Sequence, residues 1–348
     1  MRILSKITRW AAAAILVFAT AASVHFTAAP AQPLPDRLTD QEFWKIITDS
    51  SEPGGYFRAA DITNLTSNEL QYEYVLTDLV NRTKPGGVYL GVGPEQNYTY
   101  IAALKPRMAI IFDIRRGNLD LQLMYKAIFE LSKDRADFVS LLFSRPRPAG
   151  MPASYSARQL FGSFENSRHS SEAAFAKNLA AITERLTKVH GLPLLPRDVQ
   201  GIASIYRSFY QDGFAIRPYP SYDELMIATD QRGIERSYLA TEENYAILKD
   251  LESKNLVVPV VGDFGGPTAI RAIGRYLKEN NGTVTAFYLS NVEEYLYQGR
   301  KWEAFCRSVS TLPLDSSSTF IRSESGFAGG FASSLAPILG DIKGCVAR

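Results

Sequence analysis

One segment of this chain constrains its fold more than any other: two short apolar runs that flank a helix-like stretch and a pair of glycines. Residues 88–91 and 108–113 have the length and composition of buried strands, and residues 96–104 between them are typical of a helix. Gly91 and Gly93 follow the first run, where the absence of a side chain permits a tight turn and the close approach of a ligand. The segment therefore predicts a strand–turn–helix–strand unit with parallel strands.

The same alternation of apolar strands and amphipathic helices continues along the chain. We expect further strands at residues 138–143, 256–261, 283–289 and 319–322, and helices at residues 67–81, 119–132 and 267–280. The alternation lapses between residues 144 and 255, which we assign to a mostly helical insertion because structureless loops of that length are rare in a compact domain. Such insertions usually cover the ligand crevice at the carboxyl ends of strands. The glycine-rich residues 326–330 are expected near the end of a hairpin.

These elements predict an α/β fold: a Rossmann-like, doubly wound, mostly parallel sheet with a large helical insertion. N-terminal helices and the first half of the sheet would occupy residues 36–143. Residues 144–255 would form the helical insertion or lid, and residues 256–348 the second half of the sheet and a C-terminal tail.

Residues 1–31 have the pattern of a secretory signal peptide: three basic residues, an apolar run, and small residues before a cleavage point after Ala31. We therefore expect an exported protein, periplasmic or secreted, although an uncleaved N-terminal membrane anchor is the alternative. Nothing later in the chain is apolar for long enough to span a membrane. In an oxidising compartment Cys306 and Cys345 would be able to form one disulfide; the alternative is two unrelated buried thiols.

The charge of the chain excludes one class of partner. Without residues 1–31 the chain has 35 Lys and Arg against 36 Asp and Glu. Because a nucleic-acid-binding protein usually has an excess of basic residues, we expect no nucleic-acid partner and a small-molecule ligand instead. The oligomeric state cannot be predicted from these features.

Asp113 ends the second strand of the βαβ unit, where a carboxylate can accept hydrogen bonds from both ribose hydroxyls of a nucleoside. A dinucleotide fits less well. Gln96 stands where the third glycine of a dinucleotide fingerprint would be, and Pro94 removes a backbone N–H that a pyrophosphate would need. Pro94 is also an ordinary first-turn residue of a helix, which is the structural alternative.

This arrangement resembles class I S-adenosylmethionine-dependent methyltransferases, whose first strand ends in a Gly-rich turn and whose second strand ends in such an acid. The chain is more similar to an uncharacterised bacterial family with the same Rossmann core, through the motifs YLGVGPEQNY, FDIRR, VVGDFGG and YLSNVEEYL. The methyltransferase resemblance implies S-adenosylmethionine as cofactor, held by Gly91, Gly93 and Asp113. The usual acid ahead of the first glycine is missing, so Glu95 is the candidate for contact with the ligand's amino group.

Two polar residues at later strand ends are candidate catalytic residues. Asp263 directly follows the strand at residues 256–261, and Asn291 follows the strand at residues 283–289, so both should open on the same crevice. Asp263 is a candidate general base or a group that orients a substrate amine. For each residue the structural alternative is capping of the next helix, by Asp263 in one case and by Ser290 or Asn291 in the other.

Four further residues are candidate substrate-binding groups. Asn68 and Glu69 lie in a polar segment before the first strand that is able to fold over a ligand; the structural alternative for this segment is helix capping by Ser67. Arg115 and Arg116 follow Asp113 and offer a guanidinium fork for a carboxylate or phosphate. The alternative is that one of them pairs with Asp113 or with a helix-end carbonyl.

The sequence supports two principal hypotheses. The first is an exported, methyltransferase-like protein with a nucleoside-binding crevice that transfers a methyl group to a small substrate. The second is a non-catalytic exported binding or interaction module on a degenerate Rossmann fold, which avoids the difficulty that S-adenosylmethionine is made in the cytoplasm. A metal-independent hydrolase is a third possibility that requires a reactive serine, although neither G-x-S-x-G nor H-E-x-x-H occurs in the chain.

Overall fold

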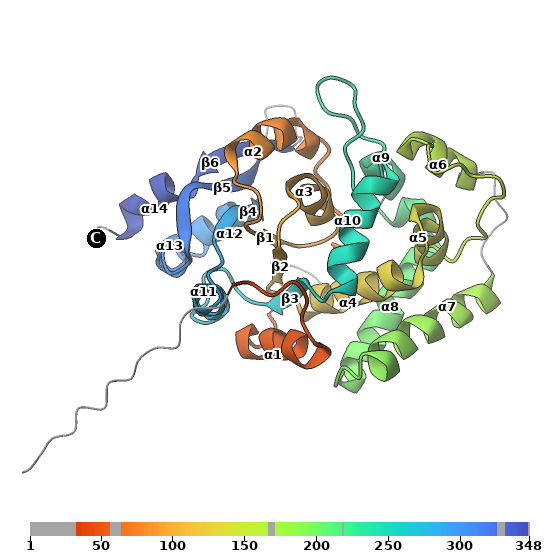
Figure 1. Ribbon diagram of the computed structural model, residues 1–348, viewed down its shortest axis with the longest axis horizontal. Helices are drawn as coiled ribbons and strands as arrows, with labels where there is room; N and C mark the ends of the chain where they lie inside the picture. The colour runs from red at the N-terminus through yellow and green to blue at the C-terminus, as the bar shows by residue number, and fades with distance from the viewer. Residues whose placement is uncertain (1–32, 56–63, 166–170, 218, 326–330, 347–348) are drawn as a thin grey trace, which may run out of the picture. The chain divides into compact units, whose positions relative to one another are not determined.

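The computed structural model describes residues 33–55, 64–165, 171–217, 219–325 and 331–346 (Figure 1). Its centre is a six-stranded sheet with the order β3-β2-β1-β4-β5-β6. The strands are β1 (Val88–Val92), β2 (Met108–Asp113), β3 (Val257–Val261), β4 (Val284–Ser290), β5 (Leu314–Ser325) and β6 (Phe331–Pro337). Neighbouring strands from β3 to β5 are parallel, and β6 pairs with β5 in the antiparallel direction. The predicted Rossmann-like α/β fold is confirmed.

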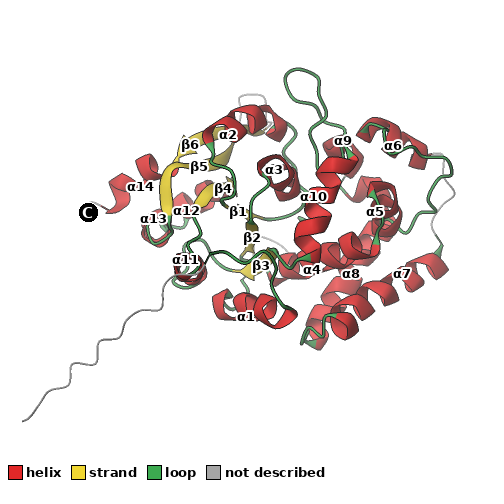
Figure 2. Cartoon of the chain, viewed as in Figure 1, coloured by secondary structure: helices red, strands yellow, loops and turns green. Residues whose placement is uncertain are grey.

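Helices cover both faces of the sheet (Figures 1 and 2). Their bounds are α1 (Asp40–Ser50), α2 (Leu76–Arg82), α3 (Gln96–Leu104), α4 (Arg116–Leu131), α5 (Arg135–Leu142), α6 (Ala157–Glu165), α7 (Glu172–Glu184), α8 (Pro196–Asp212), α9 (Tyr222–Met226), α10 (Glu242–Ser253), α11 (Ala269–Glu279), α12 (Val292–Gln298), α13 (Trp302–Val309) and α14 (Ile338–Val346). Three short turns of 3₁₀ or π helix are η1 (Tyr72–Val75), η2 (Arg185–Val189) and η3 (Gly213–Ile216). Helices α3 and α4 pack on one face, while α1 contacts β3 and α11 on the other.

Strands β2 and β3 are buried along their whole length and β4 as far as Leu289, and these strands are rich in branched and aromatic residues, as a parallel sheet between two helical layers requires. Strand β2 and helix α3 have the predicted bounds. The helix expected from residue 67 begins only at Tyr72, because the backbone N–H of Ser67 instead donates to the Glu95 side chain. The chain therefore crosses residues 64–71 without regular helix, beside the start of α3.

The prediction of a strand at residues 138–143 is wrong, because this segment belongs to helix α5 and its C-cap. Asp134 caps α5 by accepting a hydrogen bond from the N–H of Asp137. Phe138 and Leu142 lie one helical turn apart and are buried, with Phe138 packed against Phe129 of α4 at a ring distance of 4.5 Å. The next strand of the sheet is consequently β3, and the connection from β2 to β3 contains helices α4 to α10.

The expected helical insertion is present as α6 to α10. It packs mainly beside the sheet, through contacts of α8 and α10 with α4 and of α10 with α3. Residues 31–348 form one compact unit, which contains both halves of the sheet and the insertion. The glycine run at residues 326–330, expected near the end of a hairpin, lies outside the described residues.

The region expected to be a signal peptide lies outside the described residues. Among the residues that are described, no helix is both long and apolar enough to cross a membrane. Cys306 on α13 is buried and disulfide-bonded. Cys345 is the only other cysteine of the chain, and its side chain lies outside the described residues.

Candidate functional site

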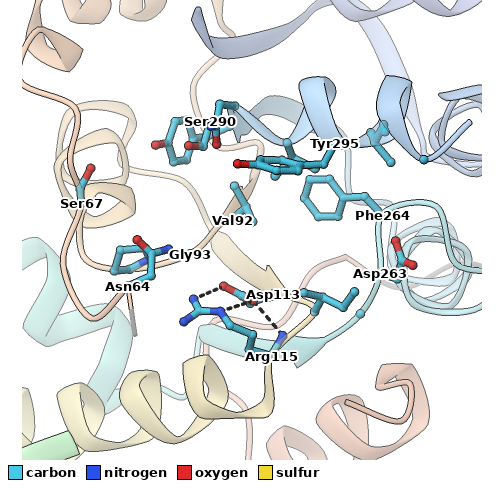
Figure 3. Close-up of a pocket in the computed structure, with 18 of the residues that line it drawn as sticks. Asn64, Ser67, Val92, Gly93, Asp113, Arg115, Asp263, Phe264, Ser290 and Tyr295 are labelled. Atoms are coloured by element: carbon cyan, nitrogen blue, oxygen red, sulfur yellow. Dashed lines mark hydrogen bonds and ion pairs between the residues drawn. The ribbon is translucent and has the colours of Figure 1, made fainter. Parts of the chain in front are cut away.

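A cavity of about 260 Å³ lies at the carboxyl ends of the central strands (Figure 3). Its walls come from the ends of four strands: residues 92–94 at the end of β1, 113–115 at the end of β2, 262–264 after β3 and 288–292 around the end of β4. The sheet order reverses direction between β1 and β4, so the cavity lies at the switch point where open α/β sheets bind ligands. Residues 64–68 and 295–301 complete the walls.

The two glycines of the β1 turn have different roles. Gly93 lines the cavity with a φ of +79°, and a Cβ atom placed on it would meet nothing within 4 Å. Gly91 is absent from the described cavity wall, and a Cβ on it would lie 1.9 Å from Oδ1 of Asn97. Asn97 uses its amide nitrogen to donate to the carbonyls of Val92 and Pro94, which fixes the turn. Gly93 thus leaves space for a ligand, whereas Gly91 leaves space for Asn97.

Asp113 lines the cavity beside Gly93, as the sequence predicts, but its carboxylate already has a protein partner. Oδ1 accepts hydrogen bonds from the backbone N–H of Arg115 at 2.8 Å and from its Nε at 3.1 Å. Oδ2 accepts one hydrogen bond from Nη2 of Arg115 at 2.7 Å (Figure 3). Both side chains are buried, so this is a desolvated ion pair at the cavity floor.

Glu95 does not face the cavity, contrary to its predicted contact with a ligand's amino group. Its side chain is buried, and Oε1 accepts the backbone N–H of Ser67 at 3.0 Å. Burial raises the pKa of Glu95 to about 7, while the hydrogen bond from Ser67 opposes that rise. Glu95 therefore holds the segment that carries Ser67 against the start of α3.

Glu69 lies behind the cavity wall and bonds to the end of β4. Its Oε2 accepts the side-chain amide of Gln96 at 3.0 Å, and its Oε1 accepts the hydroxyl of Ser290, which itself lines the cavity. Burial raises the pKa of Glu69 above its usual range. The predicted substrate contact would have to pass through Ser290, because Glu69 is only 2% exposed.

Asp263 lines the cavity at the end of β3. Its Oδ1 accepts the backbone N–H of Gly265 at 2.8 Å, and its Oδ2 pairs with the ammonium group of Lys301. Asp263 is not the cap of the following helix. Glu52 fills that role by accepting the backbone N–H groups of Thr268 at 2.7 Å and Ala269 at 3.1 Å.

Asn291 and Asn68 supply neutral polar groups to the cavity wall. Asn291 occupies the N-cap position of α12, but its side chain makes no capping hydrogen bond. Among the described residues, no hydrogen bond partner of either amide group is found. These two amides are therefore available to a ligand, whereas the carboxylates of Asp113 and Asp263 already have charged partners in the protein.

The remaining predicted site features lie away from the cavity. Arg116 begins α4 and forms a two-pronged ion pair with Asp198 of α8, at 2.6 and 2.9 Å. No described residue between 144 and 255 lines the cavity, so the expected lid position of the insertion has no support in its contacts. The insertion instead buries α4 through α8 and α10.

Several residues of the cavity wall were not predicted. Phe264, Tyr288 and Tyr295 form an aromatic part of the wall, and Lys301 stands beside Asp263. The sequence predicts Ser290 only as an alternative helix cap, although it directly precedes Asn291 at a strand end. The position of Ser290 at a strand end was the one sequence feature that could have identified it as part of the cavity wall. Its hydrogen bond to Glu69 could not be predicted, because the two residues are 221 positions apart in the sequence.

Comparison with protein-family models agrees with the resemblance to an uncharacterised family. The chain belongs to the family of the domain of unknown function DUF7790, whose model matches residues 64–334. The matched region includes all the cavity walls and the strands from β1 to β5. No curated protein matches the chain.

Proposed function

We propose that this DUF7790 protein binds a small nucleoside-type ligand in the cavity at the carboxyl ends of β1, β2 and β4. The observation that carries the proposal is the meeting of Gly93 and Asp113 at one wall of a cavity at the topological switch point. Asp113 Oδ2 accepts only one hydrogen bond from the described residues, so it retains a lone pair for a ribose hydroxyl. The open space beside Gly93 gives the sugar room.

The remaining walls suit a flat, mostly apolar ring. Phe264, Tyr288 and Tyr295 supply aromatic surface, and Asn68 and Asn291 supply amide groups that are able to donate to and accept from a base edge. The residues present therefore fit the nucleoside portion of S-adenosylmethionine. They offer no carboxylate for its amino group, because Glu95 is buried behind Ser67 and both Asp113 and Asp263 are paired.

Phosphate-containing ligands fit less well. A phosphate commonly binds at a helix N-terminus, but Glu52 already accepts the first N–H groups of α11 and Pro94 removes one before α3. The cavity of about 260 Å³ is also slightly below the range of about 300–1,000 Å³ for drug-sized ligands. A nucleoside is therefore a better match than a dinucleotide.

Methyl transfer from S-adenosylmethionine is the catalytic form of this proposal. The bound cofactor would supply the methyl group, and Asn291 and Asp263 would orient the acceptor. The pairing of Asp263 with Lys301 and Gly265 favours the alternative of binding without methyl transfer, because neither carboxylate oxygen is left without a partner to act as a base.

We also propose that the protein is exported. The basic, apolar and small-residue pattern of residues 1–31 supports this location. The disulfide at Cys306 is a second supporting feature, since disulfides persist in oxidising compartments. Mass spectrometry of the protein from culture fractions, with and without reduction, tests both the cleavage after Ala31 and the disulfide.

Isothermal titration of the full chain with adenosine, S-adenosylmethionine and its demethylated product tests the ligand. Asp113→Asn should weaken binding by roughly 10-fold or more, because it removes the charged acceptor for a ribose hydroxyl. Asp230→Asn is the matched control, since Asp230 is also buried and ion-paired, with Arg236 at 3.0 Å, but it lies outside the cavity. Absence of heat with folded protein for all three ligands contradicts the proposal.

A further inference from the structure

Ser290 lines the cavity, and its hydroxyl donates to the buried carboxylate of Glu69. It is the last residue of β4, and α12 begins two residues later at Val292. Its φ of +50° lies in the left-handed region, which is uncommon and strained for a residue with a side chain. The surrounding structure therefore holds this serine on a sharp strand-to-helix turn, with its hydroxyl at the cavity wall.

Glu69 differs from the other acids at this edge of the sheet. Asp113 is paired with Arg115 and Asp263 with Lys301, whereas Glu69 forms no salt bridge with any described residue. Its second oxygen is held by the amide of Gln96, which also contacts the hydroxyl of Tyr100 at 3.2 Å. Burial raises the pKa of Glu69, and the hydrogen bond from Ser290 opposes that rise. The geometric feature that marks Glu69 as the base is the hydroxyl of Ser290 bonded directly to its Oε1.

These contacts form a chain of nucleophile, base and orienting group. We propose that Ser290 is a nucleophile activated by Glu69, and that the cavity hydrolyses a small carboxylic ester with an apolar portion. Asn291 follows Ser290 in the chain and lines the same cavity, and its amide has no hydrogen-bond partner among the described residues, so this amide would be the donor to the oxygen that becomes negative during attack. Val92, Phe264 and Leu296 provide the apolar surface for the ester.

The reaction needs only the ester and water. Ser290 Oγ adds to the carbonyl carbon, its proton passes to Glu69 Oε1, and the bond to the alcohol oxygen breaks as that oxygen takes the proton from Glu69. Water then adds to the acyl carbon of the serine ester and gives a proton to Glu69. The bond between Oγ and the acyl carbon breaks, Oγ regains the proton, and the acid leaves.

This inference rests on Ser290 and Glu69 and does not depend on Asp113, so it can fail or succeed separately from nucleoside binding. In Figure 3, Ser290 and Tyr295 lie on one side of the cavity and the pair formed by Asp113 and Arg115 on the other. Titration with nucleosides reports on the second side, whereas covalent labelling of Ser290 reports on the first.

The direct test is labelling of the full chain with a fluorophosphonate probe, followed by peptide mass spectrometry, together with hydrolysis of p-nitrophenyl acetate. We expect phosphonylation at Ser290, in which the Oγ–P bond forms and fluoride leaves. Ser290→Ala should abolish labelling. Glu69→Gln should slow it by about 100-fold or more, the range that a general base contributes.

Ser334→Ala is the matched control, because Ser334 also donates to a glutamate, Glu324, at 2.9 Å, but in a solvent-exposed hydrogen bond between β6 and β5 that lies outside the cavity wall. It should be labelled as fast as the unmodified chain. Circular dichroism and melting temperature establish that each variant is folded. If Glu69→Gln is unfolded, Glu69→Asp, which keeps the carboxylate, takes its place. Slower labelling of the folded Glu69→Asp variant would support the proposal. An unlabelled folded chain, labelling that survives Ser290→Ala, or an unchanged rate in the folded Glu69 variant would overturn it.

Discussion

His190 provides a pH-dependent contribution to stability that can be measured directly. Its Nδ1 lies 2.6 Å from Oδ1 of Asp40, the first residue of α1, and its Nε2 lies 2.6 Å from Oε2 of Glu130 on α4. Two carboxylates can be satisfied together only by a doubly protonated ring, because a neutral imidazole has a single N–H. The hydrogen bond to Glu130, followed by that to Asp40, raises the pKa of His190 against the opposing effect of burial.

The size of the effect follows from the exposure of the two partners. A hydrogen bond to a charged group contributes about 1.5–3 kcal/mol, which applies to the Glu130 contact because that side chain is 7% exposed. Asp40 is 40% exposed, so solvent screening reduces its contact to about 1 kcal/mol or less. We expect His190→Ala to lower the free energy of unfolding by about 2–4 kcal/mol at pH 5.5, a decrease of roughly 4–10 °C in melting temperature.

The sign of the pH dependence is fixed by the direction of the pKa shift. Because the folded pKa of His190 is raised, its contribution is fully present below the unfolded pKa of about 6.5 and is lost as the pH rises through the folded value. The difference between the unmodified chain and His190→Ala should therefore shrink between pH 6 and pH 9. Lys188→Ala, which breaks only the exposed pair with Glu184, should cost less than about 0.5 kcal/mol at every pH. A difference for His190→Ala that does not change with pH would refute this reasoning.

Two further predictions concern buried positions. Burial raises the pKa of Glu252 to about 8, so the free energy of unfolding should fall as the pH rises from the unfolded pKa of 4.5 toward 8. Glu252→Gln should remove that fall and be more stable than the unmodified chain by up to about 4 kcal/mol in urea melts at pH 9. Equal stability of the two proteins at pH 9 would contradict this prediction. Gly91→Ala places a Cβ 1.9 Å from Asn97 and 2.8 Å from Tyr89, so it should cost more than about 3 kcal/mol, whereas Gly93→Ala, with a φ of +79° and open space, should cost about 1 kcal/mol. Equal losses for the two alanine variants in thermal melts would show that the β1 turn is not packed in this way.

The fold could be predicted from the sequence wherever apolar periodicity and length agreed. Strand β2 and helix α3 have the predicted bounds because each is bordered by clear turn residues. The error at residues 138–143 arose because FVSLLF is an apolar run too short to distinguish a strand from a buried helix. Its helical state depends on Asp134 as a cap and on packing against Phe129 of α4, and only the second of these is tertiary.

The candidate site could be predicted as a location but only in part as a set of free groups. Gly93, Asp113 and Asn291 line one cavity because the carboxyl ends of parallel strands meet at one edge of a sheet. The sequence left open whether Arg115 would bind a ligand or pair with Asp113, and the structure shows the pairing. The sequence does not reveal that Asn97 fills the space over Gly91. Those contacts are decided by side-chain conformation after the strands are in place.

The partners of the acids at the cavity determine what chemistry is open to the site. Arg115 and Lys301 balance Asp113 and Asp263, which suits a role in positioning a neutral ligand rather than in taking a proton. Glu69 lacks such a balancing cation among the described residues and is bonded instead to Gln96 and to the hydroxyl of Ser290. If the cavity is catalytic through one of its own acids, that acid should be Glu69, because a neutralising partner would have to be displaced before either aspartate could act as a base. A variant that removes the positive charge beside Asp263, Lys301→Met, should consequently leave fluorophosphonate labelling of Ser290 within about threefold of the unmodified rate, whereas Glu69→Gln should not.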